Sequence, residues 1–252
     1  MSTRLLSVDD LTVQFGGLTA LSHVSIEVHP GEVVGLIGPN GAGKTTLFNS
    51  ICGLVPIASG TLTLNDVTVS WPKPHELVDL NISRTLQGVG LFPDLSVMEN
   101  VKVGAQKYSK SSLLRSVFAF DKKDEKDLEE RATKALERVY ASSLGNQQAD
   151  SLPYPVQKRI AIARALVSNP RLLLLDEPAG GLGHQDIEWM NSLIKNLKVE
   201  TSILLVEHHM DVVMNVCDRI YVLNFGEVIA HGTPSEVRNN PAVIAAYLGA
   251  DA

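Results

Sequence analysis

The alternation of apolar and polar residues predicts strands in the first part of the chain. Residues 24–28 (VSIEV) alternate as a half-buried strand does, whereas residues 33–37 (VVGLI) form a continuous apolar run, typical of a central strand. Further along, the runs TLTL and VTV flank the pair Asn65-Asp66, which predicts a β-hairpin. The chain therefore begins with strands, some of them antiparallel.

The middle of the chain has a different pattern, because charged helical segments replace the strands. The stretch DEKDLEERATKALERV repeats its apolar residues at helical spacing, so that one stripe is apolar. The stripe consists of Leu128, Ala132, Ala135, Leu136 and Val139. We expect one domain over residues 1–252, with a helical subdomain inserted at about residues 88–168. The charge run KKDEKDLEE within it is typical of a solvated helix face.

Strand patterns return in the last third, in RLLLLDEP, TSILLVEHH and RIYVLNFGEVIAHG, separated by helical stretches such as DIEWMNSLIKNL. Strands that alternate with helices predict a mostly parallel sheet covered on both faces. Residues 233–236 (TPSE) have the form of a capping box that begins another helix. The predicted fold class is α/β: a mostly parallel central sheet, an N-terminal antiparallel β part and the inserted helical subdomain.

Composition narrows the class of protein. The chain has 252 residues, of which 44% are apolar and 20% charged, as in a globular protein with a buried core. A formal net charge of −6 argues against nucleic-acid binding, and two cysteines are too few for a disulfide framework. No apolar run approaches the roughly 18 residues of a membrane span. We expect a soluble protein, or one that a partner holds at a membrane.

The strongest chemical pattern is GPNGAGKTT at residues 38–46, between a predicted strand and a predicted helix. Glycines let backbone N–H groups point at phosphates, Lys44 adds a positive charge, and the Thr45 hydroxyl can ligate Mg²⁺. The alternative is a glycine-rich connection without a ligand, but every fixed position of the phosphate-binding loop, or P-loop, is present. The residues expected to bind the nucleotide are Gly38, Asn40, Gly41, Ala42, Gly43, Lys44, Thr45 and Thr46.

Polar residues follow two other apolar runs. Asp176 and Glu177 end the run LLLLDE, where Asp176 can hold the Mg²⁺ shell and Glu177 can polarise the attacking water. His208 follows ILLVE, and ligands of open α/β sheets bind beyond the carboxyl ends of the strands. The alternatives are solvated acids and a structural histidine, and His209 competes with His208 for the role.

These motifs, in one order, resemble the nucleotide-binding subunit of an ABC transporter over essentially the whole chain. The order is GPNGAGKTT, RTLQ, PYPVQKRIAIARAL, LLLLDEP and VEHH. The segments FGGLTAL, AGGLGH and FGEVIAHGTPSEV resemble more narrowly the ATPase subunits of importers for branched-chain amino acids, urea and amides. The resemblance implies a subunit that uses ATP and Mg²⁺ to energise a membrane importer.

The resemblance also implies residue roles and partners. Phe15 stacks on adenine, Gln87 senses the metal and the attacking water, Glu177 is the catalytic base and His208 the switch histidine. The metal shell comprises Thr45, Gln87 and Asp176. Two such domains dimerise head to tail at the cytoplasmic face of the cell membrane, where the helical insert meets permease subunits. An extracytoplasmic binding protein takes part indirectly, and no nucleic acid is involved.

The loop that grips the partner's nucleotide departs from the family pattern. It consists of Leu152, Pro153, Tyr154, Pro155, Val156 and Gln157. Pro153 has no hydroxyl and Pro155 no N–H, although proline is well tolerated in a first helical turn. The resemblance then implies a heterodimer with a second ATPase subunit and one degraded site, or else a homodimer in which both sites work. Gly183 also replaces the usual Asn or Asp of the loop that crosses the dimer interface.

Two other functions are open at this point. A soluble ABC-type ATPase acting on DNA or the ribosome would show a second ATPase domain, a long coiled coil or a basic surface, which this sequence lacks. A weakly hydrolysing regulatory subunit is favoured by Pro155, whereas Glu177 and His208 argue against it. The transported substrate is chosen by other subunits, so this sequence does not separate branched-chain amino acids, urea and amides.

Overall fold

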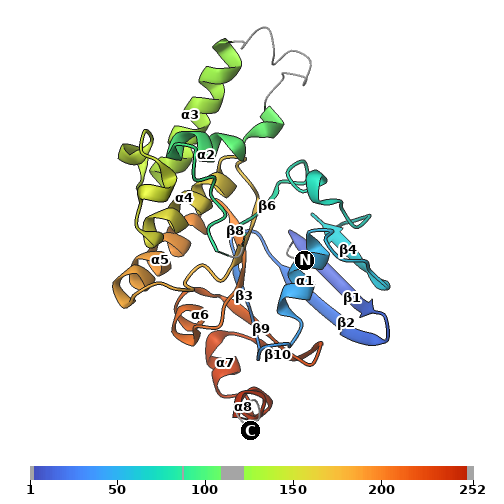
Figure 1. The fold of residues 1–252 in the computed structure, drawn as a ribbon. Helices are drawn as coiled ribbons and strands as arrows, with labels where there is room; N and C mark the ends of the chain where they lie inside the picture. The colour runs from blue at the N-terminus through green and yellow to red at the C-terminus, as the bar shows by residue number, and fades with distance from the viewer. Residues whose placement is uncertain (1–2, 87, 109–121, 249–252) are drawn as a thin grey trace. The chain divides into compact units, whose positions relative to one another are not determined.

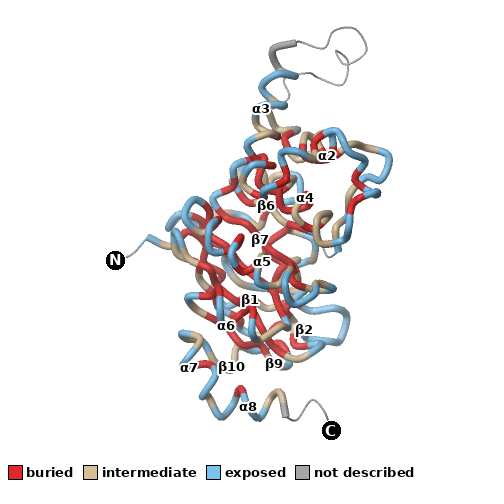
Figure 2. Tube along the Cα trace, turned by 90° about the vertical axis from the view of Figure 1, so that its left-hand side faces the viewer, coloured by how far each residue is buried: buried red, intermediate tan, exposed pale blue. Residues whose placement is uncertain are grey.

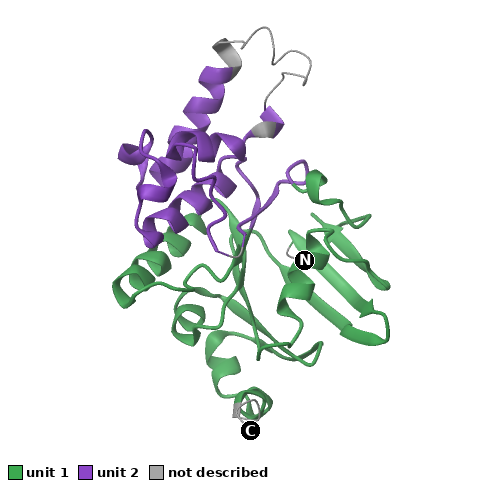
Figure 3. Cartoon of the chain, in the orientation of Figure 1, with its two compact units in different colours: residues 1–77, 174–252 green, residues 78–173 purple. Residues whose placement is uncertain are grey.

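The computed structural model describes residues 3–86, 88–108 and 122–248 (Figure 1). The chain forms two compact units, shown in different colours in Figure 3: unit 1 contains residues 1–77 and 174–252, and unit 2 contains residues 78–173. Among the described residues, no helix is both long enough and apolar enough to cross a membrane.

Unit 1 contains an antiparallel sheet in the order β2-β1-β4-β5. Its strands are β1 (Leu6–Phe15), β2 (Leu18–Val28), β4 (Ser59–Leu64) and β5 (Val67–Val69). The alternating run at residues 24–28 is the end of β2, with Val24, Ile26 and Val28 buried. Asn65 and Asp66 link β4 to β5 with φ of 52° and 62°, as a tight hairpin turn requires, so the predicted hairpin is confirmed.

Within unit 1 the second sheet runs in the order β10-β9-β3-β8-β7, and β7 belongs to this unit from Leu174 on. The strands are β3 (Val33–Ile37), β7 (Leu172–Asp176), β8 (Ser202–Val206), β9 (Arg219–Asn224) and β10 (Glu227–Gly232). β3 lies parallel between β8 and β9, and β10 is antiparallel to β9. Every residue of β3, β7 and β8 is buried (Figure 2), which explains their continuous apolar runs.

Five α-helices accompany these sheets in the part of unit 1 that the structure describes. They are α1 (Lys44–Ile51), α5 (His184–Leu197), α6 (Met210–Val216), α7 (Pro234–Arg238) and α8 (Pro241–Leu248). In Figure 1, α1 lies on one side of the parallel strands and α5 and α6 on the other. α7 begins with the predicted capping box: Glu236 N–H donates to the Thr233 hydroxyl, and Thr233 N–H donates to the Glu236 carboxylate.

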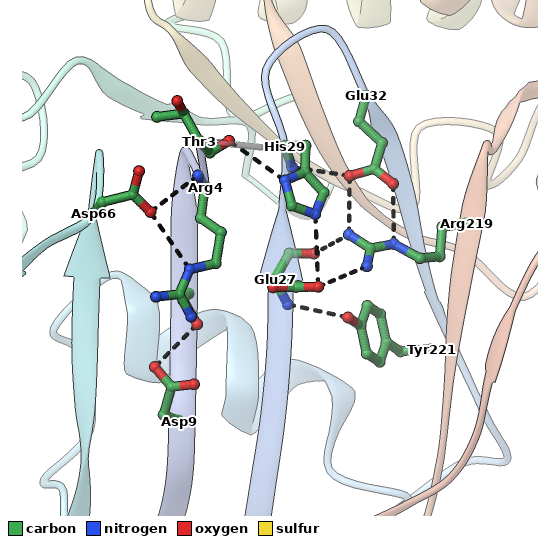
Figure 4. A network of polar contacts seen from close by, with 10 residues as sticks. Thr3, Arg4, Asp9, Glu27, His29, Glu32, Asp66, Arg219 and Tyr221 are labelled. Atoms are coloured by element: carbon green, nitrogen blue, oxygen red, sulfur yellow. Dashed lines mark hydrogen bonds and ion pairs between the residues drawn. The ribbon is translucent and has the colours of Figure 1, made fainter. Parts of the chain in front are cut away.

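A network of charged hydrogen bonds joins the two sheets of unit 1 (Figure 4). Arg219 on β9 donates from Nε and Nη2 to the two oxygens of Glu32, both at 3.0 Å. Its Nη1 donates to Glu27 Oε1 on β2, also at 3.0 Å, and Glu27 N–H donates to the Tyr221 hydroxyl at 3.2 Å. The network thus holds β2 beside β9.

The described residues of unit 2 form the short strand β6 and three α-helices. They are β6 (Ile82–Arg84), α2 (Val97–Val103), α3 (Lys122–Arg138) and α4 (Tyr154–Leu166). α3 contacts both α2 and α4, and its predicted apolar stripe buries Ala132, Ala135 and Leu136. Asp127 and Arg131 form an ion pair of 2.9 Å along α3.

A candidate nucleotide-binding site at the strand ends of unit 1

The P-loop connects the buried strand β3 to α1. Gly43 is the N-cap of α1 and has a φ of 103°, a value that residues other than glycine rarely adopt. A Cβ at this position would lie 2.7 Å from Leu21 Cδ2 and 3.0 Å from the Ala20 carbonyl oxygen. The glycine therefore lets the loop turn into the helix beside β2. This places the start of α1 at the carboxyl end of β3.

Lys44, Thr45 and Thr46 form the first turn of α1, whose N–H groups have no partner within the helix. Lys44 is buried, and its Nζ donates to the carbonyl oxygens of Gly38 at 2.6 Å and Pro39 at 2.9 Å. Burial lowers the pKa of Lys44, whereas the negative charge of Glu177 acts to raise it. Amide donors, a helix N-terminus and a nearby cation together suit a bound phosphate chain.

The two acids stand at the end of β7. Asp176 is its last residue and is buried, while the side chain of Glu177 is about one-third exposed at 32%. Glu177 has a φ of 47°, a left-handed conformation that costs about 1 kcal/mol in a residue with a Cβ. Its N–H donates to Val206 O at 2.9 Å, which ties this strained residue to the end of β8. Thr45 is exposed, and its hydroxyl and the Asp176 carboxylate offer oxygen ligands of the kind that Mg²⁺ prefers.

The two adjacent histidines differ in what their rings face. His208 Nδ1 lies 3.6 Å from Glu177 Oε1 and 3.8 Å from Glu207 Oε2, and the His208 side chain is half exposed. The ring of His209 instead hydrogen-bonds to the buried carboxylate of Glu207, with 3.0 Å between Nδ1 and Oε2. The geometry therefore favours His208 over His209 as the histidine beside Glu177.

The other predicted site residues are not joined to this group. Phe15 ends β1 and is 44% exposed, as an aromatic surface available for stacking must be. Gln87 lies outside the described residues, and the loop at residues 152–157 belongs to unit 2. The structure thus brings together Lys44, Glu177 and His208, with Asp176 next to Glu177. The roles of Phe15, Gln87 and the loop stay predictions.

α4 begins at Tyr154 despite its two prolines, as the sequence predicts. Pro153 is its N-cap and Pro155 the second helical residue, and no side chain caps this end. Val156 N–H and Gln157 N–H both donate to Pro153 O, at 2.9 and 3.0 Å. Pro153 and Pro155 have no N–H of their own, so this helix start has fewer amide donors for an anion than an ordinary one.

Two residues lie in the region of the site although no sequence pattern predicts their place there. Glu207 follows the apolar run of β8 and is fully buried, although its position in VEHH reads as the start of a polar segment. On α8, burial raises the pKa of the Tyr247 hydroxyl, and the backbone of Gly38 opposes this rise. The capping box at residues 233–236 predicts a helix there, but no pattern predicts that α8 lies beside the P-loop, where Ala245 lines one pocket together with Asn40 and Gly41.

Comparisons with known proteins agree with this geometry. The profile of the family described as "ABC transporter" matches residues 21–180, and that of "Branched-chain amino acid ATP-binding cassette transporter" matches residues 227–252. The chain is 42% identical over 253 residues to "High-affinity branched-chain amino acid transport ATP-binding protein LivG" of Escherichia coli K12, covering 99% of each chain. It is 39% identical over 254 residues to the protein of the same description named BraF, of Pseudomonas aeruginosa, again covering 99% of each.

Solved structures give the same result for the fold. The crystal structure of the ADP conformation of MJ1267, an ATP-binding cassette of an ABC transporter, is 32% identical in sequence with a TM-score of 0.86. The match covers 98% of this chain and 100% of that one. The predicted α/β fold class, with its antiparallel part and mostly parallel sheet, is thereby confirmed. This chain belongs to the ABC transporter family and is an ATP-binding and ATP-hydrolysing domain of that family.

Proposed function

We propose that this chain is the ATP-hydrolysing subunit of an importer for branched-chain amino acids or related small polar solutes. The observation that carries the catalytic part is the 3.6 Å separation between His208 Nδ1 and Glu177 Oε1, beside the P-loop. The choice of substrate class rests on the full-length similarity to LivG and BraF and on the match of residues 227–252.

The P-loop residues bind the phosphates in this proposal. The amides of residues 41–46 and the positive end of α1 hold the β- and γ-phosphates, and Lys44 exchanges its loop carbonyls for phosphate oxygens. Thr45, Asp176 and Gln87 would hold Mg²⁺, and the bound ion would neutralise phosphate charge. Phe15 stacks on the adenine ring.

Glu177 and His208 carry out the hydrolytic step. Glu177 accepts a hydrogen bond from the attacking water and orients it toward the γ-phosphate. His208 presents Nδ1 to Glu177, so that Nε2 is the ring nitrogen left to contact the γ-phosphate. The strained backbone of Glu177 and its bond to Val206 fix the carboxylate at the strand end.

The loop at residues 152–157 serves a second ATPase subunit in our proposal. In a head-to-tail dimer the start of α4 faces the partner's nucleotide, and its prolines remove amide donors from that contact. A heterodimer with one competent and one degraded site follows. Permease subunits contact unit 2 and hold the chain peripherally at the cytoplasmic face of the membrane, while an extracytoplasmic binding protein delivers the solute.

The catalytic part is tested by Glu177→Gln in the complex recovered with the second ATPase subunit, because the proposed competent site includes a loop of that subunit. General-base catalysis contributes about 10²- to 10⁴-fold, so we expect kcat to fall by at least about 100-fold while ATP affinity is retained. Steady-state hydrolysis and binding of Mg-ATP to the variant measure both quantities. Hydrolysis at the wild-type rate would exclude Glu177 as the base.

The partner is tested by affinity purification from mildly solubilised membranes followed by mass spectrometry. We expect stoichiometric recovery of a different ATPase subunit and of permease subunits. Recovery of this chain alone with permeases would contradict the heterodimer. Within a recovered complex, changing Glu177 should reduce turnover more than the equivalent change in the partner, and equal losses would contradict the asymmetric arrangement.

A second candidate is a regulatory subunit that binds ATP and hardly hydrolyses it. The missing N–H of Pro155 favours this reading. Steady-state hydrolysis and Mg-ATP binding distinguish the two functions. A wild-type chain that binds Mg-ATP in its complex without turnover would support the regulatory function.

A further inference from the structure

Glu207 is a fully buried acid that the proposed hydrolytic mechanism does not use. It stands between β8 and α6, directly before His208, with an exposure of 0%. A buried carboxylate is stable only when its oxygens accept hydrogen bonds, because burial removes their water. The partners of Glu207 therefore indicate what the residue holds in place.

The two oxygens of Glu207 bind two different segments of the chain. Oε1 accepts a hydrogen bond from Ala179 N–H at 2.7 Å, in the turn that follows Glu177. Oε2 accepts from His208 N–H at 2.9 Å and from His209 N–H at 3.1 Å. The ring Nδ1 of His209 is also 3.0 Å from Oε2. One carboxylate thus links the segment of Glu177 to the segment of His208.

Because the groups that face Glu207 are hydrogen-bond donors, both of its side-chain oxygens must be acceptors. Three of the partners are backbone N–H groups, and the fourth is the His209 ring, which donates when Nδ1 carries its proton. A carboxylate offers acceptor sites on each oxygen, whereas an amide would place an NH₂ group against donors. Glu207 and the two histidines also have ligand atoms within 4.8 Å of one another. We do not interpret them as a metal site, because N–H donors already occupy both oxygens of Glu207.

The turn after β7 is fixed to the end of β8 at two points. Glu177 N–H donates to Val206 O, and Ala179 N–H donates to the side chain of the next residue, Glu207. These bonds hold Glu177 in its left-handed conformation. The same carboxylate fixes the backbone of His208, so it acts on both members of the pair that lies 3.6 Å apart.

From this arrangement we propose that Glu207 is a positioning residue that sets the distance between Glu177 and His208. The inference rests on the proposed function of those two residues. The four hydrogen bonds of Glu207 go to residues 179, 208 and 209 and none of these four to the P-loop or α1, so we expect its effect to fall on the hydrolytic step. Displacing a catalytic group by about 1 Å can reduce a rate about 100-fold.

The test compares three forms of the complex recovered with the second ATPase subunit, which contain the wild-type chain, Glu207→Gln or Glu188→Gln. Glu188 is an exposed residue of α5, so Glu188→Gln makes the same chemical change without altering the buried contacts. For Glu207→Gln we expect kcat for ATP hydrolysis to fall about tenfold to 100-fold. The affinity of the purified chain for Mg-ADP, measured by calorimetry, should stay within about twofold, and Glu188→Gln should match the wild type in both quantities.

Each outcome is decisive. A folded Glu207→Gln variant with the kcat of the wild type would overturn the proposal, and so would equal losses of kcat and Mg-ADP affinity, which indicate a general structural defect. If Glu207→Gln does not fold, His209→Phe decides instead, because it removes one of the four donors and keeps an aromatic ring. We then expect a smaller fall in kcat with unchanged Mg-ADP affinity, and an unchanged kcat would overturn the proposal. Absence of hydrolysis in the wild type would instead contradict the proposed function.

Discussion

Two helices of this chain begin at places where a phosphate is expected, and they begin in opposite ways. α1 starts from Gly43, whose positive φ turns the backbone so that the first-turn amides stay available. α4 starts from Pro153, with Pro155 as its second residue. Proline supplies the φ angle that a first turn needs and removes the N–H that an anion would use.

The difference teaches that the start of a helix and the binding of an anion are separable properties. α4 has a regular first turn in which Val156 and Gln157 donate to Pro153, so its folding does not depend on a ligand. α1 starts from a conformation that glycine adopts readily and other residues rarely adopt, and its buried lysine donates to carbonyl groups of its own loop. The helix whose start requires glycine is the one equipped to bind phosphate.

The largest effect should come from removing the flexibility of the α1 start. Gly43→Ala places a Cβ 3.0 Å from the Ala20 carbonyl oxygen at a φ of 103°. Left-handed strain of about 1–2 kcal/mol, added to this overlap, should weaken Mg-ADP binding at least about tenfold. Calorimetry measures the affinity and urea unfolding the stability.

Gly41→Ala is the matched control within the same loop. Its φ is 79°, but a Cβ there would meet no atom within 4 Å. It carries only the conformational strain, so its effect on affinity and stability should be smaller than that of Gly43→Ala. Equal effects from the two substitutions would show that crowding at the α1 start is unimportant.

A smaller, opposite effect should follow from repairing the α4 start. The double substitution of Pro153→Ser and Pro155→Gly restores two N–H groups and one hydroxyl at this helix end. A hydrogen bond to a charged group contributes about 1.5–3 kcal/mol, and the lower figure corresponds to about tenfold, so turnover of the assembled complex should rise about tenfold. Steady-state ATPase assays of the complex measure this gain.

The control for the repair is Pro234→Gly, at the first position of α7. It makes the same kind of change at a helix start that has no part in the site, so turnover should not change. If the repaired α4 also leaves turnover unchanged, the prolines do not limit the composite site and the asymmetric arrangement loses its basis.

The smallest effect on hydrolysis should come from Arg219→Met, which separates stability from phosphate contact. Loss of its charged hydrogen bonds to Glu27 and Glu32 should lower the free energy of unfolding by about 1–3 kcal/mol and leave turnover within about twofold. Arg4→Met is the control, since its exposed pair with Asp66 at 3.5 Å should contribute less than about 1 kcal/mol. Urea unfolding of both variants and an ATPase assay provide the comparison.

The same substitution makes a prediction about pH. Burial acts to raise the pKa of Glu27. The hydrogen bond and the positive charge of Arg219 lower this pKa by more than burial raises it, so the net shift is downward. The stability from a lowered carboxyl pKa is present above the pKa of the unfolded chain and is lost as pH falls through the folded value. Unfolding of the wild type should therefore lose more free energy between pH 6 and about pH 3 than unfolding of Arg219→Met. A parallel loss in both would contradict this role of Arg219.

The sequence predicted those parts of the fold that repeat along the chain. The alternation in β2, the apolar runs of β3, β7 and β8 and the capping box before α7 each have a local pattern, and the structure confirms them. The P-loop and the order of motifs predicted the family for the same reason. These features are encoded by neighbouring residues.

The contacts that build the site are a different matter, because they join residues distant in sequence. Nothing near Glu207 predicts that its carboxylate accepts from Ala179, and nothing near His209 predicts that its ring turns to Glu207. The choice between His208 and His209 required the position of Glu177. Sequence supplied the chemical groups, whereas their pairing depends on strands that meet only in the folded sheet.

The position of β3 within its sheet has a consequence for how the protein is made. β3 spans Val33–Ile37, but its hydrogen-bonding neighbours on both sides are β8 and β9, which begin at Ser202 and Arg219. During synthesis on the ribosome, the strand that carries the P-loop waits for most of the chain before either edge can pair, and contacts of such sequence separation form slowly. A nascent chain thus exposes an apolar strand for most of its translation, and it gains the capacity to bind nucleotide only near the end.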